Sequence, residues 1–168
     1  MPKRMRRSSL GRFYGSSRPD ARRGPRRLRA CLANVTRGRV ASKGKPYRHV
    51  TFAGYDILVG KGDQENDVLT FDVGQPDDLW LHVASGVAGS HVVVRNPERL
   101  PELPAPVVTR AAELAAWHSK ARGAGKVEVH VCRVADVSKP KGFPAGKVLL
   151  SRWKRLKVYP RLHAEDEA

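Results

Sequence analysis

The chain is 168 residues long and carries a formal net charge of +16. That length allows one modest domain with its own core, and the charge favours a polyanionic partner, either nucleic acid or an anionic membrane. No apolar run approaches the ~20 residues that cross a bilayer, so we expect a soluble, cytoplasmic protein without membrane contact. Cys31 and Cys132 form no metal-ligand pair, and we expect no disulfide, no metal and no cofactor.

The first 45 residues hold most of the positive charge. They contain 15 Lys and Arg against one acidic residue, a net charge of +14, whereas residues 46–168 have a net charge of only +2. Their Arg-, Gly-, Ser- and Pro-rich composition, with few large apolar side chains, predicts a disordered basic arm. Three interpretations stay open: an RNA-binding arm, an organellar transit peptide, or a start assigned too far upstream of a true beginning near residues 35–45.

Residues 46–162 have the pattern of a compact domain, and residues 163–168 form an acidic tail. Residues 48–52 and 55–60 read as two short strands joined by Ala53-Gly54, a plausible hairpin. A short helix is expected over residues 63–71, with Asp63 as its N-cap.

Strict alternation marks the next two strands, which begin near Asp78 and His91 with a glycine-containing loop between them. In the first strand the aliphatic residues share one face, and Asp78, Trp80 and His82 share the other. Trp80 could stack on an unpaired base, while His82 stacks and hydrogen-bonds beside it. In the alternative interpretation, Trp80 packs under the long helix and His82 is satisfied by Asp78. A strand spacing of four residues separates Asp78 and His82 by about 13 Å, which makes direct contact difficult.

A proline-rich connector over residues 96–106 leads to the most regular helix, residues 109–122, which Thr109 could cap and Gly123 could end. A strand over residues 126–134 follows. Residues 148–150 and 156–159 are expected to pair as a last hairpin. The sequence therefore predicts an α+β fold, a mostly antiparallel sheet with one long helix packed on it.

Two basic segments are further candidates for phosphate contact. Residues 139–147 place two glycines among three lysines, Lys139, Lys141 and Lys147, without the spacing of a Walker A loop. An ordinary basic turn is the alternative there. Lys120 and Arg122 lie at the predicted helix end, where the helix dipole alone favours cations.

An enzyme is the competing class, because Asp78, His82, His91 and His118 could form an acid–base set or a metal site. His118 falls on the apolar face of the predicted helix, which favours a buried, satisfied histidine. No nucleophile elbow, HExxH motif or Cys-rich ligand set accompanies these residues. The sequence offers no catalytic residue set and no metal-ligand set.

A series of short motifs nevertheless resembles one family, the NFACT-R domain, which is found in ribosome quality-control factors of the RqcH and NEMF type. The motifs are, in order, YDILVGK at 55–61, QEND at 64–67, PDDLWLH at 76–82, GSHVV at 89–93, SKAR at 119–122, KPKG at 139–142 and LKVYP at 156–160. In that family the domain is an RNA-binding module that works with other domains to hold tRNA on a large ribosomal subunit.

The resemblance implies RNA-facing roles for a set of matched residues. They are Asp78, Trp80, His82, Ser90, His91, Lys120, Arg122, Lys139 and Lys141, to which the basic loop adds Lys147. Asn66 and Asp67 also match, and we expect them to brace local structure. The chain has no room for the family's other domains, so we expect a stand-alone form and infer no tailing of nascent chains.

The expected function is therefore RNA binding, with tRNA or ribosomal RNA and possibly the large ribosomal subunit as partner. An RNA-processing or RNA-modifying enzyme, or a subunit of one, that uses the His and Asp residues is the alternative. Neither the bound RNA nor the oligomeric state follows from the sequence.

Overall fold

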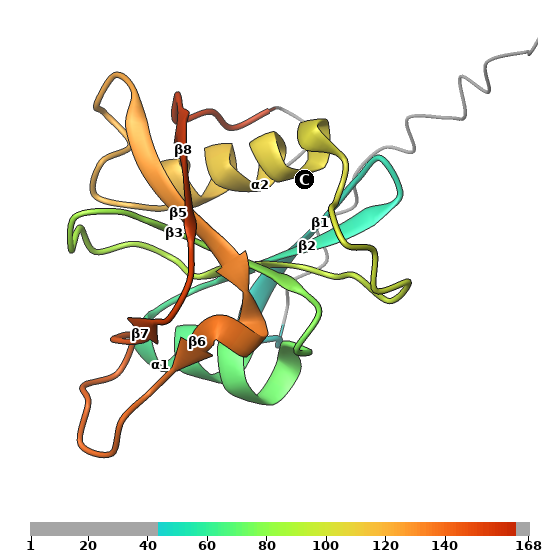
Figure 1. The fold of residues 1–168 in the computed structure, drawn as a ribbon. Helices are drawn as coiled ribbons and strands as arrows, with labels where there is room; N and C mark the ends of the chain where they lie inside the picture. The colour runs from blue at the N-terminus through green and yellow to red at the C-terminus, as the bar shows by residue number, and fades with distance from the viewer. Residues whose placement is uncertain (1–43, 164–168) are drawn as a thin grey trace, which may run out of the picture. The chain divides into compact units, whose positions relative to one another are not determined.

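A six-stranded antiparallel sheet is the centre of the computed structural model, which describes residues 44–163. Its strands lie in the order β1-β2-β4-β3-β5-β8, and Figure 1 shows the sheet between helix α2 and helix α1. The strands are β1 (Tyr47–Phe52), β2 (Tyr55–Gly60), β3 (Leu79–Val83), β4 (Val92–Val94), β5 (Val127–Arg133) and β8 (Lys154–Val158). The predicted arm, apart from residues 44 and 45, and the tail after His163 lie outside the described residues.

Both faces of this sheet are covered. Helix α2 (Ala105–Trp117) packs on one face, where Leu81, Val92 and Val129 contribute to a large aliphatic core. The opposite face carries a smaller core that includes Trp80 and Cys132, beneath α1 (Asp63–Asp67), the π-helix η1 (Val68–Val73) and the small sheet β6–β7. Burial raises the pKa of the Cys132 thiol to about 12, in keeping with a packing role.

The prediction of an α+β fold with a mostly antiparallel sheet is confirmed, but the helix boundaries were wrong. Helix α2 begins at Ala105 after an N-cap at Pro104, inside the segment assigned to an irregular connector. Proline is tolerated in a first helical turn because the N–H it lacks has no intrahelical partner there. The helix ends at Trp117, so Lys120 and Arg122 lie in the turns that follow it.

The shorter helices also differ from the expectation. Asp63 is the first residue of α1 rather than its cap, since Gly62 occupies the N-cap position without a side-chain hydrogen bond. The helix then continues into η1, which places Leu69 and Thr70 in the buried layer under β3 and β4.

The predicted hairpin at the C-terminal end is wrong. After β5, a 3₁₀ turn η2 (Val134–Asp136) leads to β6 (Val137–Ser138), which pairs with β7 (Leu149–Leu150). The last strand, β8, instead returns to the main sheet and pairs with β5. Residues 139–147 therefore form the loop between β6 and β7, and β8 is left as an edge strand.

Candidate nucleic-acid interface

Trp80 does not offer an open face to a base in this structure. It is 1% exposed, and its indole Nε1 donates to Oγ1 of Thr70 at 3.2 Å. The stacking interpretation is therefore wrong for Trp80, because helix η1 covers this face of β3. The alternative interpretation was also wrong in detail, since Trp80 lies on the side of the sheet opposite α2.

Three rings form a compact cluster in this layer. The Trp80 ring stacks on the His82 ring with 5.9 Å between ring centroids, and it meets the His91 ring edge-on with 4.9 Å between centroids. The centroids of the two histidine rings lie 5.2 Å apart. Burial lowers the pKa of His91 to about 3 and also lowers that of His82. Both imidazoles are neutral at pH 7, so neither supplies positive charge to a phosphate.

A single hydroxyl links this cluster to the helix. Thr70 Oγ1 donates to the carbonyl of Asn66 at 2.8 Å and lies 2.9 Å from Nδ1 of His91. Because the one hydroxyl hydrogen points to Asn66, Nδ1 of His91 must carry a proton and donate to Thr70. The hydrogen bonds of His91 thus fix η1 to the sheet and involve no carboxylate.

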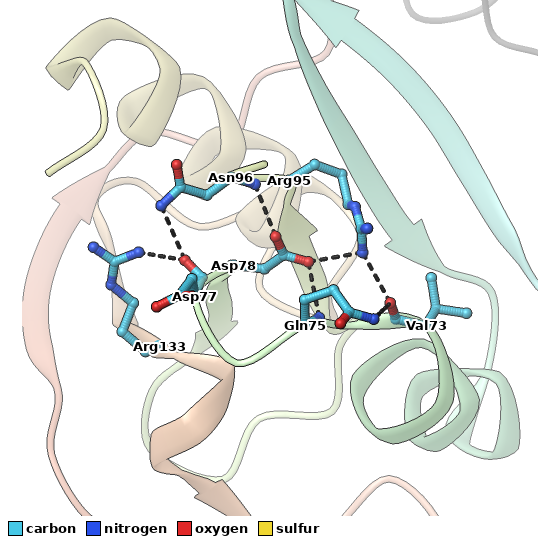
Figure 2. Close-up of polar contacts among 7 residues, drawn as sticks. All are labelled: Val73, Gln75, Asp77, Asp78, Arg95, Asn96 and Arg133. Atoms are coloured by element: carbon cyan, nitrogen blue, oxygen red, sulfur yellow. Dashed lines mark hydrogen bonds and ion pairs between the residues drawn. The ribbon is translucent and has the colours of Figure 1, made fainter. Parts of the chain in front are cut away.

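Asp78 joins the turn before β3 to the segment that follows β4 (Figure 2). This carboxylate is 2% exposed and accepts the backbone N–H groups of Gln75 at 2.9 Å and Asn96 at 2.7 Å. The Arg95 guanidinium donates to it at 2.8 Å and also to the carbonyl of Val73. Asp78 therefore fixes the start of β3, and the prediction that it contacts RNA is wrong in this structure, as is the alternative in which it satisfies His82.

Two neighbouring side chains extend this network to the connector before α2. Asn96 donates to the carbonyls of Asp77 and Leu100, and its own side-chain oxygen accepts the N–H of Leu100. The Arg133 guanidinium donates to the carbonyls of Asp77, Leu100 and Pro101. Figure 2 shows Asp77 between these two side chains. Their hydrogen bonds go to backbone groups of the chain, so the network stabilises the connector before α2.

Ser90, Lys120 and Arg122, in contrast, come together at an open groove of about 590 Å³. Arg48 and Lys61 also line it, and neither is among the site residues predicted from the sequence. Lys61 could have been found from its motif, but Arg48 is an isolated cation in a strand and gave no signal. Among the described residues of the lining, four cations face one carboxylate, that of Asp63. The groove is therefore a positive concave surface.

The floor of the groove depends on Asn66, as expected of a bracing residue. Its side-chain oxygen accepts the N–H of His91 at 2.9 Å, and its amide donates to the carbonyl of Gly89 at 3.1 Å. A Cβ at Gly60 would lie 2.1 Å from that oxygen, so only glycine fits there. Ser90 is 9% exposed and donates to the carbonyl of Gly60 at 2.6 Å, which makes its hydroxyl a brace as well.

A bridge between two loops sets the position of the basic wall. Gly89 pairs with Ser119, and Lys120 donates its N–H to the carbonyl of Ala88 at 2.9 Å. A Cβ at Gly89 would lie 2.8 Å from the Cβ of Ser119, so glycine permits the close approach. The side chains of Lys120 and Arg122 are therefore carried by a fixed turn.

His118 borders the same groove but carries no charge at neutral pH. Burial, together with the positive charges of Arg48 and Arg122, lowers its pKa to about 4. It is half-buried rather than buried, which only partly matches the expectation of a core histidine. The cationic character of the groove comes from its Lys and Arg side chains.

The predicted basic loop lies against α1. Lys139 forms an ion pair with Asp67, and the N–H of Gly146 donates to the same carboxylate at 3.2 Å. Asp67 thus braces the loop, as expected from its motif. Lys139 is partly engaged by this pair, whereas Lys141 and Lys147 are exposed.

Residues 44–163 contain neither a metal cluster nor a membrane-spanning helix. No group of three or more His, Cys, Asp or Glu side chains in that range could hold a metal ion. No helix there has both the length and the apolar character needed to cross a membrane.

Comparisons with known proteins agree on one family. Residues 45–152 match the family described as the NFACT protein RNA binding domain. The chain is 39% identical over 126 residues to the Rqc2 homolog RqcH of Streptococcus suis, covering 74% of this chain and 22% of that protein. It is 38% identical over 111 residues to the Bacillus subtilis protein of the same name, covering 63% and 19%.

A solved structure shows the same fold. The C-terminal part of the fibronectin/fibrinogen-binding protein from Streptococcus suis superimposes with a TM-score of 0.66 at 35% identity, over 77% of this chain and 50% of that one. The chain spans about a fifth of the length of the two RqcH proteins. The ordered motifs, the sheet with its two covered faces and these matches agree: the chain belongs to the NFACT-R family of RNA-binding domains.

Proposed function

We propose that this chain binds tRNA or ribosomal RNA in the cytoplasm, in a ribosome quality-control setting that includes the large ribosomal subunit. The observation that carries the proposal is the convergence of Lys61, Lys120 and Arg122 on one groove beside the Gly89–Ser90 backbone. The RqcH relatives and the family description support RNA as the ligand class.

The chemistry of the groove suits a folded RNA backbone. Lys and Arg side chains neutralise phosphates and release counterions, which gives affinity without base selectivity. Among the described residues of the lining, Trp117 is the only ring besides His118, and it is half-buried, so the groove offers little open area for stacking. The groove therefore recognises the path of the phosphates and with it the shape of the RNA.

The basic loop supplies further contacts. Asp67 holds the backbone of Gly146 and the side chain of Lys139 against α1, whose first residue also lines the groove. Lys141 and Lys147 are therefore displayed from a braced loop rather than a free one. We assign them to additional phosphates of the same RNA.

No observation favours the enzyme alternative. His82 and His91 do come together, but His91 is buried, His82 is half-buried, and both are neutral rings whose contacts are structural. Asp78 is occupied by Arg95 and two backbone N–H groups.

The test compares single-charge variants of the full chain. Lys120→Ala and Arg122→Ala should each weaken tRNA binding and lower the slope of log K against log salt by about 0.9 for each phosphate that is no longer neutralised. Arg99→Ala is the matched control, because Arg99 is 81% exposed, lies outside the groove and pairs only loosely with Asp77. Filter binding at four salt concentrations gives both quantities. If the groove variants behave like Arg99→Ala, the groove is not the tRNA site.

A further inference from the structure

The positive charge of the folded region is concentrated in its last segment. Residues 46–138 contain nine Lys and Arg against twelve acidic residues, whereas residues 139–162 contain eight Lys and Arg and no acidic residue. The small net charge of the folded region therefore combines a negative part, residues 46–138, with a strongly basic C-terminal segment, residues 139–162. A segment of this kind attracts a polyanion independently of the groove.

The same segment displays aromatic rings. Among the described residues, the exposed aromatic side chains are Phe71 at 41%, Phe143 at 36%, Trp153 at 44% and Tyr159 at 50%. Three of these four lie within residues 139–162. Exposed rings interleaved with cations are the usual construction of a single-strand binding surface, where bases stack and phosphates meet Lys or Arg.

The edge strand β8 arranges two of these rings in a row. Side chains alternate along a strand, so in β8 Leu156 and Val158 enter the core under α2 while Arg155 and Lys157 point to the other side. The same alternation groups Arg155 and Lys157 with the two residues that flank the strand, Trp153 before it and Tyr159 after it. We call these four residues the β8 row; six residue steps make it about 20 Å long.

Contacts with the neighbouring strand place Arg155 and one side of Trp153 on the face opposite α2, while Trp153 also lines a cleft beside Val108 and Thr109 of α2. Arg155 lies directly opposite His130 of β5, and the His130 ring contacts that of Trp153 at 5.6 Å. One side of the indole is therefore supported, and 44% of the residue's surface remains open. This is the arrangement that the sequence had suggested for Trp80 and His82, two strands further along the sheet.

The remaining contacts of the β8 row are weak enough for RNA to replace. The Arg155–Glu128 ion pair spans 3.5 Å with Arg155 66% exposed, and such surface pairs contribute about 0–1 kcal/mol. At the other end, Lys126 and Arg161 lie 5.7 and 6.0 Å from the centre of the Tyr159 ring. Both cations would remain available to phosphates beside a base stacked there.

We propose that the β8 row binds an unpaired stretch of RNA, with Trp153 and Tyr159 stacking on bases and Arg155 and Lys157 contacting the phosphates between them. The inference rests on the proposed function, because it extends RNA binding from the groove to a second surface. The match to the family model ends at residue 152, although Lys157 and Tyr159 belong to the LKVYP motif that resembles the family.

Tryptophan fluorescence gives a test that the basic arm does not obscure. The chain has three tryptophans, Trp80, Trp117 and Trp153, and none lies in residues 1–45. The full chain is titrated with ten-nucleotide oligouridine at 0.3 M salt, which weakens purely electrostatic binding. We expect the emission to be quenched as the strand binds. The Trp153→Phe variant should keep its affinity within about threefold but lose the quenching.

Affinity measured by anisotropy of labelled oligouridine completes the test. Trp153→Ala should weaken binding about 5- to 150-fold, the range for the removal of one base stack. Arg155→Ala with Lys157→Ala should lower the salt slope by about 1.4, since a single strand loses about 0.7 per phosphate. Phe71→Ala removes an exposed ring outside the segment and should change nothing.

The outcomes separate the β8 row from the groove. Undiminished quenching in Trp153→Phe, or unchanged oligouridine affinity in Trp153→Ala, overturns the β8 row even if Lys120→Ala still weakens tRNA binding. The β8 proposal is also overturned if the wild-type protein does not bind oligouridine. It is overturned as well if an acidic peptide binds at this edge and RNA does not compete with it. Failure of Lys120→Ala and Arg122→Ala to affect tRNA would instead remove the groove and leave a β8 effect standing.

Discussion

Replacing Asp78 by alanine should destabilise the fold severely while leaving the RNA-binding surfaces themselves unchanged. The carboxylate is 2% exposed and accepts hydrogen bonds from three groups, one in its own turn and two on the adjacent residues Arg95 and Asn96 (Figure 2). Alanine removes all three at once. Asp77 provides the matched control, because it precedes Asp78 directly and its 51% exposed side chain forms a loose ion pair with Arg99 at 3.5 Å.

The magnitude follows from what each partner does after the change. The N–H of Asn96 belongs to a residue 3% exposed, and leaving it unsatisfied costs about 1–3 kcal/mol. The N–H of Gln75 belongs to an exposed residue and can turn to water, so its loss costs about 0.5–1.5 kcal/mol. Arg95 is 33% exposed and still donates to Val73, so its pair contributes only about 0–1 kcal/mol after solvent screening. The expected total is about 1.5–5.5 kcal/mol.

Urea denaturation followed by tryptophan emission measures this change, since Trp80 lies two residues along in β3. Asp77→Ala should lose at most about 1 kcal/mol of unfolding free energy. The reasoning is refuted if Asp78→Ala is no less stable than Asp77→Ala. It is also refuted if Asp78→Ala keeps its stability but loses affinity for RNA, because Asp78 would then be a contact after all.

Three more substitutions or conditions test the site. Gly60→Ala should displace the Asn66 side chain, which breaks two hydrogen bonds and leaves a buried amide unsatisfied. The free energy of unfolding measured by urea denaturation should fall by about 2–4 kcal/mol. Gly123→Ala is the control, because an added Cβ there meets nothing, and it should cost less than about 1 kcal/mol. The pKa of His91 is lowered to about 3, so as pH falls the unfolded chain binds a proton at this residue before the folded chain does. Between pH 6.5 and about 3, His91 should therefore contribute a loss of up to about 1.4 kcal/mol of unfolding free energy per pH unit, beside the share of His118. His91→Asn should remove the His91 share of that dependence, which urea denaturation at a series of pH values measures. Trp80→Phe should lower the free energy of unfolding by about 1–2 kcal/mol, because the indole hydrogen bond is removed. It should leave tRNA affinity within twofold, since the ring is buried. A tenfold fall in affinity at equal stability would show that Trp80 contacts RNA after all.

The parts of the fold that follow from local pattern were predictable. Alternation located the start of β3 and both ends of β5 within one residue, and the turn at Ala53-Gly54 located the first hairpin. In these segments the side-chain period and the turn chemistry act over a few residues and agree with the tertiary structure.

The errors came from information that a local pattern does not carry. Pro104 and Pro106 read as breakers, although one is the N-cap of α2 and the other lies in its first turn. The pairing of β8 with β5 rather than β7 depends on which hydrophobic face each strand must bury, and that is settled only when the whole sheet assembles.

The same limit applied to the site. Lys120 and Arg122 were identified because their motif gave their position, but nothing local brings Arg48 of β1 to the same groove. The prediction for Trp80 is wrong because polar neighbours on a strand face indicate exposure, whereas this face is covered by η1. Its neighbours Asp78 and His82 are polar residues that the fold buries wholly or in part, beneath η1 and beside the connector.

Coverage of the sheet explains where RNA can bind at all. Sheet-based RNA readers stack bases on an open central face, but here α2 fills one face, and α1, η1 and β6–β7 cover the central strands on the other. Aromatic residues in the middle of the sheet are thereby committed to packing. Contact surfaces remain where coverage ends: at the loops that form the groove and along the edge strand β8, where His130 supports one side of Trp153 and 44% of the residue stays exposed. The two surfaces use different chemistry, phosphate contacts in the first and stacking in the second, so folded and single-stranded ligands should separate their contributions.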